Sequence, residues 1–145
     1  MAKLVLAISS KYFTSYLDAF TSHLVWKEGK PCLDFNKSPD LEAYYIKGIL
    51  EVVSEMLSIE GLTLSQIKMV FPPQISSSFI TNLSCRMNVA RDKFIDIAND
   101  TDLFTSSLPY TLQYACEHNL VEVGDIGLII SVSSGIQVGC AIYYF

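Results

Sequence analysis

Apolar stretches separated by short polar turns divide the first third of the chain into strand-like and helix-like segments. Residues 3–9 are mostly apolar with weak alternation, which predicts a buried strand. Residues 16–25 mix aromatic, β-branched and small side chains and predict a second extended segment. A turn is expected at 26–31, followed by a short returning strand at 32–35. This part of the chain therefore predicts one strand and then a hairpin.

A long helix is predicted to follow the hairpin. Ser38-Pro39-Asp40 combines a capping hydroxyl, a proline suited to the first helical turn and an early carboxylate. Apolar residues then recur at helical spacing up to about Ile59, and Gly61 is expected to end the helix in a left-handed conformation. The segment 63–66 matches a capping box and predicts a further short helical turn.

The remaining segments alternate between strands and helices. Strands are predicted at 67–71, 94–98, 126–131 and 138–144, and helices at 75–87 and 106–118. Asn88 is expected to stop the first of these helices, and turns are expected at 99–102, 123–125 and 133–135. Strands separated by helices favour a mixed sheet with helices packed on it. We expect residues 1–145 to form a single α/β domain.

Composition limits the classes of function. Half of the 145 residues are apolar and 17% are charged, with a mean hydropathy of +0.34. Either the strands are fully buried in a compact core, or the surface carries an apolar area that binds a partner. The net charge of −5 argues against nucleic-acid binding. No apolar run reaches the length of about 18 residues that spans a membrane, so we expect a cytoplasmic protein.

Cysteine and histidine positions do not indicate a metal site or a cofactor. The cysteines are Cys32, Cys85, Cys116 and Cys140, and none is part of a C-x-x-C pair. The last three lie in apolar contexts and are expected to pack in the core, whereas Cys32 follows Pro31 in a turn and is expected to be the most exposed. His23 and His118 have no cysteine or serine at motif spacing and are expected to be structural. We therefore expect no metal and no cofactor.

Several short motifs occur in an order that resembles one enzyme family. They are Gly61-Leu62-Thr63-Leu64-Ser65-Gln66-Ile67, Phe71-Pro72-Pro73-Gln74-Ile75-Ser76, Asp102-Leu103-Phe104-Thr105-Ser106-Ser107-Leu108-Pro109, Val123-Gly124-Asp125-Ile126 and Ser134-Gly135-Ile136-Gln137-Val138-Gly139-Cys140-Ala141. From Leu41 to the C-terminus the chain resembles the C-terminal half of ketoacyl-acyl-carrier-protein synthase III, a member of the thiolase superfamily. The resemblance implies one half of a thiolase-like fold, with a mixed five-stranded sheet packed with helices.

The same resemblance implies a catalytic site that is altered at each of its positions. The family uses a cysteine, a histidine and an asparagine, and the cysteine belongs to an N-terminal half that lies outside this resemblance. Pro73 stands at the histidine position, and Asp102 stands at the asparagine position. Ser78 stands where an arginine of the family contacts the carrier protein. Because a prolyl ring can neither accept a proton nor donate a hydrogen bond, Pro73 is expected to be inactive.

These substitutions lead to three hypotheses. The chain could be catalytically silent alone and act as a structural or partner subunit in acyl transfer, in fatty acid or polyketide synthesis. Its partner would be a second copy or a separate N-terminal-half ketosynthase chain, and an acyl carrier protein is a further candidate. Alternatively, Asp102 could complete an acyltransferase site with a cysteine-bearing partner, although it could also be a carboxylate flanking a helix. A third hypothesis is an excised or remnant domain without activity.

A small group of cations could form a contact with a carrier protein. Arg86, Arg91 and Lys93 lie close together in the sequence, and an acidic carrier protein could bind such a cluster. The simpler interpretation is ordinary solvated charge, which the acidic balance of the whole chain favours. The sequence leaves both interpretations open.

Overall fold

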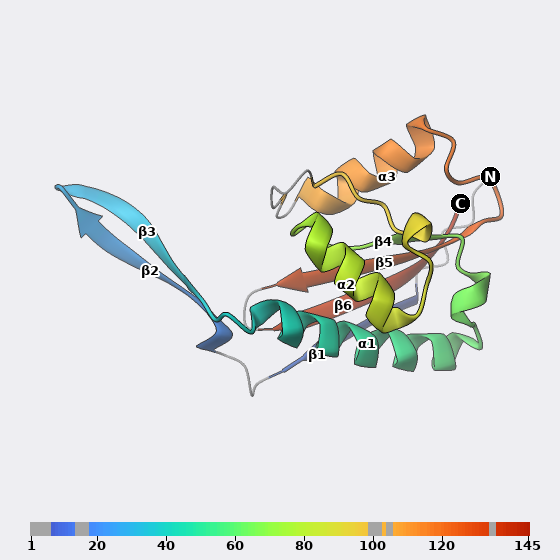
Figure 1. Cartoon of the computed structure of the whole chain (residues 1–145), viewed down its shortest axis with the longest axis horizontal. Helices are drawn as coiled ribbons and strands as arrows, with labels where there is room; N and C mark the ends of the chain where they lie inside the picture. Colours follow the sequence, from blue (N-terminus) through green and yellow to red (C-terminus); the bar gives the residue numbers. More distant parts are fainter. Residues whose placement is uncertain (1–6, 14–17, 99–102, 104–105, 134–135) are drawn as a thin grey trace.

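A four-stranded mixed sheet forms the centre of the molecule, in a computed structural model that describes residues 7–13, 18–98, 103, 106–133 and 136–145. The strand order is β1-β6-β5-β4, and a separate two-stranded hairpin, β2-β3, projects from one end (Figure 1). The strands are β1 (Ala7–Tyr12), β2 (Phe20–Lys27), β3 (Lys30–Lys37), β4 (Met69–Phe71), β5 (Ile126–Ser133) and β6 (Gln137–Tyr144). The helices are α1 (Leu41–Glu60), α2 (Ser77–Met87) and α3 (Ser107–Glu117), with short 3₁₀ turns η2 (Leu64–Gln66) and η3 (Arg91–Lys93).

The sheet is mixed, as predicted, but its edges differ from the sequence-based expectation. β6 pairs antiparallel with both β1 and β5, and β5 pairs parallel with β4. The fifth strand predicted at 94–98 is only a single bridge between Phe94 and Val70. The first strand is an edge strand that continues to Tyr12, and Ile8 on it is 65% exposed. A strand is therefore present at 7–9, but the expectation that it is buried is wrong at Ile8, and residues 3–6 lie outside the described residues.

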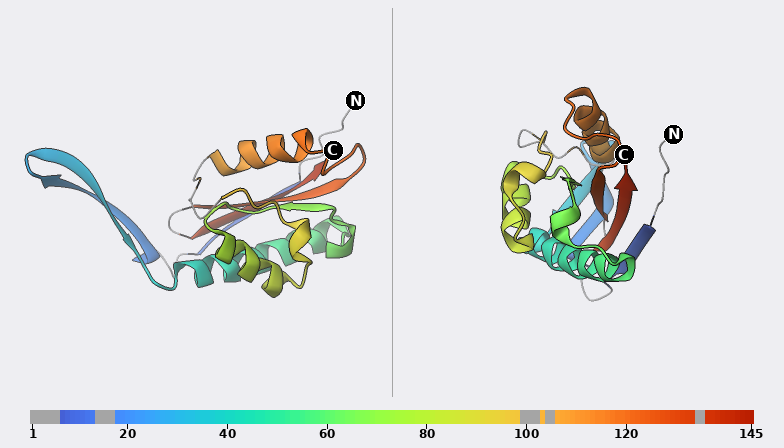
Figure 2. Two further views of the ribbon diagram at one scale, coloured as in Figure 1. Left: turned by 45° about the horizontal axis from the view of Figure 1, so that its top comes forward. Right: turned by 90° about the vertical axis from the view of Figure 1, so that its right-hand side faces the viewer.

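The two faces of the sheet are covered unequally. α1 and α2 pack on one face and α3 lies on the other (Figure 2). The α1/α2 side holds the larger core, which includes the fully buried Ile49, Val70 and Phe79. Gly48 allows α1 to approach β6 closely, since a Cβ atom there would lie 2.9 Å from Cγ2 of Val138. The core on the α3 side is smaller, so this face is the less completely covered one.

Local sequence signals set the C-terminal ends of α1 and α2 as predicted, whereas both helices begin two residues later than predicted. Gly61 ends α1 in the left-handed conformation, and Asn88 ends α2 in the same way. The Ser76 hydroxyl accepts a hydrogen bond from the Phe79 backbone N–H at the start of α2, which satisfies one of the free donors there. The predicted capping box is present, with Thr63 at the N-cap of η2. α1 begins at Leu41, two residues later than a proline in the first helical position would give.

The hairpin forms by a two-residue turn at Glu28 and Gly29. Both residues have positive φ angles, of 53° and 76°, and this pair of left-handed residues is the turn that best matches the twist of an antiparallel ribbon. The sequence placed the turn correctly. The pairing runs from Phe20–Lys37 to Lys27–Lys30, so β2 extends two residues beyond the predicted segment 16–25, and β3 is longer at both ends than the predicted strand 32–35.

Candidate functional site

A hollow formed by described residues lies where the parallel strands β4 and β5 end. It has a volume of about 730 Å³ and is open to solvent. Its walls come from five places: the base of the hairpin, the start of α1, the turn after β4, the start of α3 and the end of β5. Ligand sites of α/β proteins commonly form at the carboxyl ends of such strands. We therefore take this hollow as the candidate site.

Pro73 lies in the wall of this hollow, directly after β4. It is buried, as is the neighbouring Pro72. A proline ring lacks an ionisable nitrogen and fixes the backbone φ angle, so Pro73 shapes the exit of the strand without offering a proton acceptor. The resemblance had assigned Pro73 to the position of a catalytic histidine, and the residue lines the candidate site.

The adjacent Gln74 is a buried polar clamp that sequence reasoning did not single out. Its side chain has no exposed surface. The amide nitrogen donates to the carbonyl oxygens of Pro72 and Ile95 at 3.1 and 3.0 Å, and the amide oxygen accepts from the Ile97 backbone N–H at 2.9 Å. Gln74 therefore ties the turn after β4 to the segment that was predicted as the fifth strand. A polar residue directly after two prolines at the end of an apolar strand was the available signal.

The Asp102 assignment falls outside the described residues. The following residue, Leu103, donates its backbone N–H to the carbonyl oxygen of Gln74 at 3.0 Å.

Ser78, at the position of the family's arginine, is exposed on α2, and its hydroxyl lies 3.0 Å from the hydroxyl of Ser76. A serine there offers no positive charge to a carrier protein.

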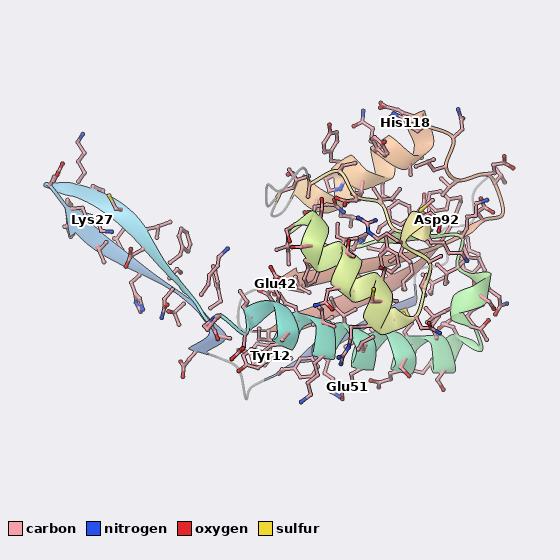
Figure 3. All side chains as sticks on the ribbon, in the orientation of Figure 1. Tyr12, Lys27, Glu42, Glu51, Asp92 and His118 are labelled. Atoms are coloured by element: carbon pink, nitrogen blue, oxygen red, sulfur yellow. The ribbon has the colours of Figure 1, made fainter. Side chains whose placement is uncertain are left out.

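Ionisable groups are sparse in the described wall of the hollow. Lys37 and Glu42 are the two charged residues among the described lining side chains. This lining contains no histidine or cysteine with which they could form a catalytic pair. Glu42 lies at the start of α1, whereas His118 lies at the far end of α3 (Figure 3). The Lys37 ammonium is 5.7 Å from the centroid of the Phe20 ring. Apart from the Gln74 amide, which is bonded to the backbone, the rest of the wall is apolar or carries hydroxyl groups, so it suits an apolar ligand better than acid–base catalysis.

Residues 57–145 match the family model described as 3-Oxoacyl-[acyl-carrier-protein (ACP)] synthase III C terminal. The chain belongs to this family. Beta-ketoacyl-[acyl-carrier-protein] synthase III of Desulfotalea psychrophila is 26% identical over 98 residues, which is 67% of this chain and 30% of that protein. The sequence resemblance to the C-terminal half of synthase III is thereby confirmed.

Solved structures agree with the fold. Synthase III from Thermus thermophilus matches 99% of this chain with a TM-score of 0.83 at 15% identity, and the chain covers 46% of that protein. Synthase III from Pseudomonas aeruginosa matches 96% with a TM-score of 0.82 at 13% identity, and the chain covers 43% of it. OleA of Xanthomonas campestris matches 94% with a TM-score of 0.79. At these identities the match shows the thiolase-like fold alone, and the chain spans less than half of each protein.

The cysteines of this synthase III C-terminal domain are distributed differently from the prediction. Cys85 and Cys116 are exposed, Cys32 is half-buried and Cys140 is buried. Helix α2 turns Leu83 and Met87 inward, and Cys85 lies outside that inner face. Burial, with a smaller effect of the Glu55 charge, raises the pKa of the Cys140 thiol to about 11. Cys140 packs against Met56, with 3.6 Å between the sulfur atoms, and is held as a neutral thiol rather than a nucleophile.

The two histidines occupy separate elements, away from the hollow. His118 caps α3, where its Nδ1 lies 2.9 Å from the Tyr114 carbonyl oxygen and its ring stacks on the Tyr114 ring. His23 is exposed on the hairpin, opposite Asp34. Neither lines the candidate site.

Two of the three clustered cations bind groups within the domain itself. Arg91 forms an ion pair with Asp96 and donates to the Thr81 hydroxyl at 3.2 Å. Lys93 donates to the Ile67 carbonyl oxygen at 2.8 Å. Arg86 is exposed in the last turn of α2. These internal contacts give Arg91 and Lys93 a structural role in holding η3 against the sheet.

Within the described ranges, no cluster of three histidine, cysteine or carboxylate side chains is arranged to hold a metal ion. No described helix combines the length and the apolar character needed to cross a bilayer.

Proposed function

We propose that this synthase III C-terminal domain is catalytically silent alone and acts as a structural or partner subunit in acyl transfer, in fatty acid or polyketide synthesis. The observation that carries the proposal is Pro73 in the wall of the hollow. In a condensing site this position must steady the developing oxyanion or move a proton, and proline can do neither. Residues 1–145 are proposed to form one domain.

The walls of the hollow support binding without chemistry. Phe20, Phe35 and Phe71 offer apolar surface, and the described lining contains neither a histidine nor a cysteine. An acyl chain is the ligand class that such a wall suits best. The OleA structure from Xanthomonas campestris was solved with bound lauric acid and lauroyl-CoA, which is consistent with a ligand of this class in a related fold.

The less covered face of the sheet supports a partner. The register places Ile8 of β1 opposite Ala141 and Tyr12 opposite Gln137. Ile8 and Tyr12 are both exposed, and Ala141 belongs to the small core on the α3 side. This exposed face fits a complementary domain, either a separate N-terminal-half ketosynthase chain or a second copy. An acyl carrier protein is a weaker candidate, because Ser78 provides no cation.

The test is reconstitution with a cysteine-bearing N-terminal half of a synthase III, followed by an assay of decarboxylative condensation. We expect the chain alone and the reconstituted complex to show no turnover above background. The matched variant Pro73→His, assembled in the same way, restores the missing group and controls for assembly. Turnover by the complex with Pro73 intact, at a rate near that of a full-length synthase, would contradict the proposal.

A second candidate function is that Asp102 completes a composite acyltransferase site with a cysteine from the partner. It is favoured by the hydrogen bond from Leu103, the next residue, to Gln74 in the wall of the hollow. Transfer to an alcohol or amine acceptor should then occur in the complex and be lost in Asp102→Ala. Equal transfer by the complexes with Asp102 and with alanine would remove this candidate, and Asp125→Ala, a carboxylate in the turn before β5, is the matched control.

A further inference from the structure

A second hollow lies between the last turns of α1 and α2, and it shares no lining residue with the hollow that holds Pro73. It has a volume of about 400 Å³ and is open to solvent. Helix α2 lies beside α1 on the same face of the sheet, and the segment that follows Gly61 contributes a third wall (Figure 1). This hollow is termed the α1–α2 groove. Its apolar floor consists of Leu50, Val53, Leu57, Leu62, Leu64 and Met87.

The floor of the α1–α2 groove is part of the main core. Val53, Leu57 and Met87 are buried, and the partly exposed Leu50 and Leu62 pack against the same core. Close-packed side chains are held in fixed rotamers by their neighbours, so the floor keeps its shape without a ligand. The volume lies within the range of about 300–1,000 Å³ that small-molecule sites occupy. The groove is therefore preformed and large enough for a short alkyl chain.

The polar residues of the described lining are Ser54, Ser58 and Arg86. The two serines are four residues apart on α1, so they lie on one side of that helix. Arg86 lies in the last turn of α2 and is the one charged residue of this lining. The α1–α2 groove thus combines an apolar floor with two hydroxyl groups and one cation.

The Arg86 guanidinium is not used by the domain itself. Within the part of the chain that the structure describes, it forms no ion pair and no side-chain hydrogen bond, whereas Arg91 and Lys93 both bind internal groups. It is not required as a helix cap either, because the N–H groups of Asn88 and Val89 already bond to carbonyl oxygens of the last turn of α2. The cation is therefore free to bind a ligand.

We propose that the α1–α2 groove binds a medium-chain carboxylate, with the alkyl chain on the apolar floor and the head group on Arg86. A guanidinium binds a carboxylate through two parallel hydrogen bonds, and the serine hydroxyls are further donors in the same lining. One positive charge matches a head group with one negative charge. A doubly charged phosphate is less favourable, because the chain itself has a net charge of −5.

The size of the α1–α2 groove favours a small ligand over a protein partner. Nine residues line it. A standard protein–protein interface uses about 20–30 residues on each side. A short alkyl chain, in contrast, needs only the apolar floor. The inference does not rest on the proposed function, because the groove is separate from the hollow that holds Pro73 and no activity is measured.

The experiment is titration of the intact chain with octanoate, octanol and octyl phosphate, followed by amide NMR spectra. The three ligands share one tail and differ in the charge of the head group. Octanoate is expected to bind with a dissociation constant of about 1 mM or below and to shift the amide signals of Leu57, Leu62 and Met87. Octanol should bind about three- to tenfold more weakly, and octyl phosphate should bind no more tightly than octanoate. Hexanoate should bind up to about tenfold more weakly than octanoate, because two methylene groups are lost from the floor.

Matched variants test the cation. Arg86→Gln should weaken octanoate binding about three- to tenfold and leave octanol binding unchanged. Lys68→Gln removes an exposed cation outside the groove and should bind octanoate as the wild-type chain does. Arg86→Glu should reverse the preference, so that octylamine binds more tightly than octanoate. Because Arg86 is exposed, the amide signals far from the groove should be the same in all of these variants.

Several outcomes would overturn the proposal. One is the absence of amide shifts at the groove with octanoate at about ten times the expected dissociation constant. Another is equal octanoate affinity of the wild-type chain and Arg86→Gln. Octanoate shifts confined to Ile75 and Ile130 would place the ligand in the first hollow, which overturns this proposal and leaves the proposed function intact. Tighter binding of octyl phosphate would overturn the choice of head group. Shifts at the groove that appear only with an added protein partner would assign it to that partner instead.

Discussion

The central sheet and the projecting hairpin are both built from strands with alternating side chains, yet they obtain their stability differently. In the sheet, β5 and β6 bury side chains between α1 on one side and α3 on the other. In the hairpin, the same alternation gathers Leu24, Trp26 and Leu33 on one side, and these side chains are 63–70% exposed among the described residues. An apolar pattern therefore specifies which side of a strand needs to be covered, and the position of the strand in the fold decides whether the chain itself covers it.

The largest expected difference between the two regions comes from one substitution made in each. Phe79→Ala removes a fully buried ring from the main core and should lower the free energy of unfolding by about 3–5 kcal/mol. Phe35→Ala, on the hairpin, should lower it by less than about 1 kcal/mol. Urea denaturation of both variants checks this. Equal losses would mean that the hairpin unfolds as part of the same core.

A somewhat smaller effect is expected at the clamp between β4 and its neighbouring segment. Gln74→Leu preserves the approximate volume but leaves the Ile97 N–H and the carbonyl oxygens of Pro72 and Ile95 without the amide. The expected cost is about 2–4 kcal/mol of unfolding free energy. Gln113→Leu, at an exposed position of α3, is the control and should cost almost nothing. A Gln74→Leu variant with the same free energy of unfolding as the wild-type chain would show that the fold does not depend on these hydrogen bonds.

The next expected difference between the sheet and the hairpin is the reactivity of their cysteine thiols. Cys140 has a pKa raised to about 11 by burial, whereas Cys32 lies half-buried on the hairpin. Alkylation of Cys140 near pH 8 should be at least about 100-fold slower than that of Cys32, as measured by mass spectrometry of digested protein. Comparable rates would mean that the α1–β6 core opens readily.

The same thiol predicts a dependence of stability on pH. Its pKa is raised above the ordinary 9.0, so the neutral thiol is favoured in the folded state. Its contribution is complete below about pH 9 and is lost as the pH rises toward about 11. The wild-type chain should therefore lose more stability over this range than Cys140→Ala, while Cys85→Ala should follow the wild type.

The smallest effect concerns the hairpin turn. Glu28 has a φ angle of 53°, which asparagine tolerates better than glutamate. Glu28→Asn should stabilise the hairpin by about 0.5–1 kcal/mol, visible as slower amide exchange in β2 and β3 with no change in the unfolding of the sheet. Glu28→Gln removes the same charge without favouring the turn and should have no such effect. Slower exchange throughout the sheet would contradict the independence of the two regions.

Several features could be predicted from the sequence because they depend on neighbouring residues alone. The ends of α1 at Gly61 and of α2 at Asn88 follow from capping rules, and the turn at Glu28-Gly29 follows from its position between two apolar runs. The proline at position 73 was likewise evident, because a motif assigns it without any knowledge of contacts. These local signals were enough to identify the family and to show that position 73 carries no side chain that could act as a base.

The remaining features were decided by contacts between distant parts of the chain. Cys85 and Cys140 lie in similarly apolar sequence, yet one is exposed and one is buried, since Cys85 lies outside the inner face of α2 whereas Cys140, on β6, packs against Met56 of α1. Gln74 became a clamp only because the segment at 95–97 runs beside it. The exposed side of the hairpin has the same cause. The sequence shows its alternation, but only the tertiary structure leaves Leu24, Trp26 and Leu33 exposed while Phe20 at the base packs against the core.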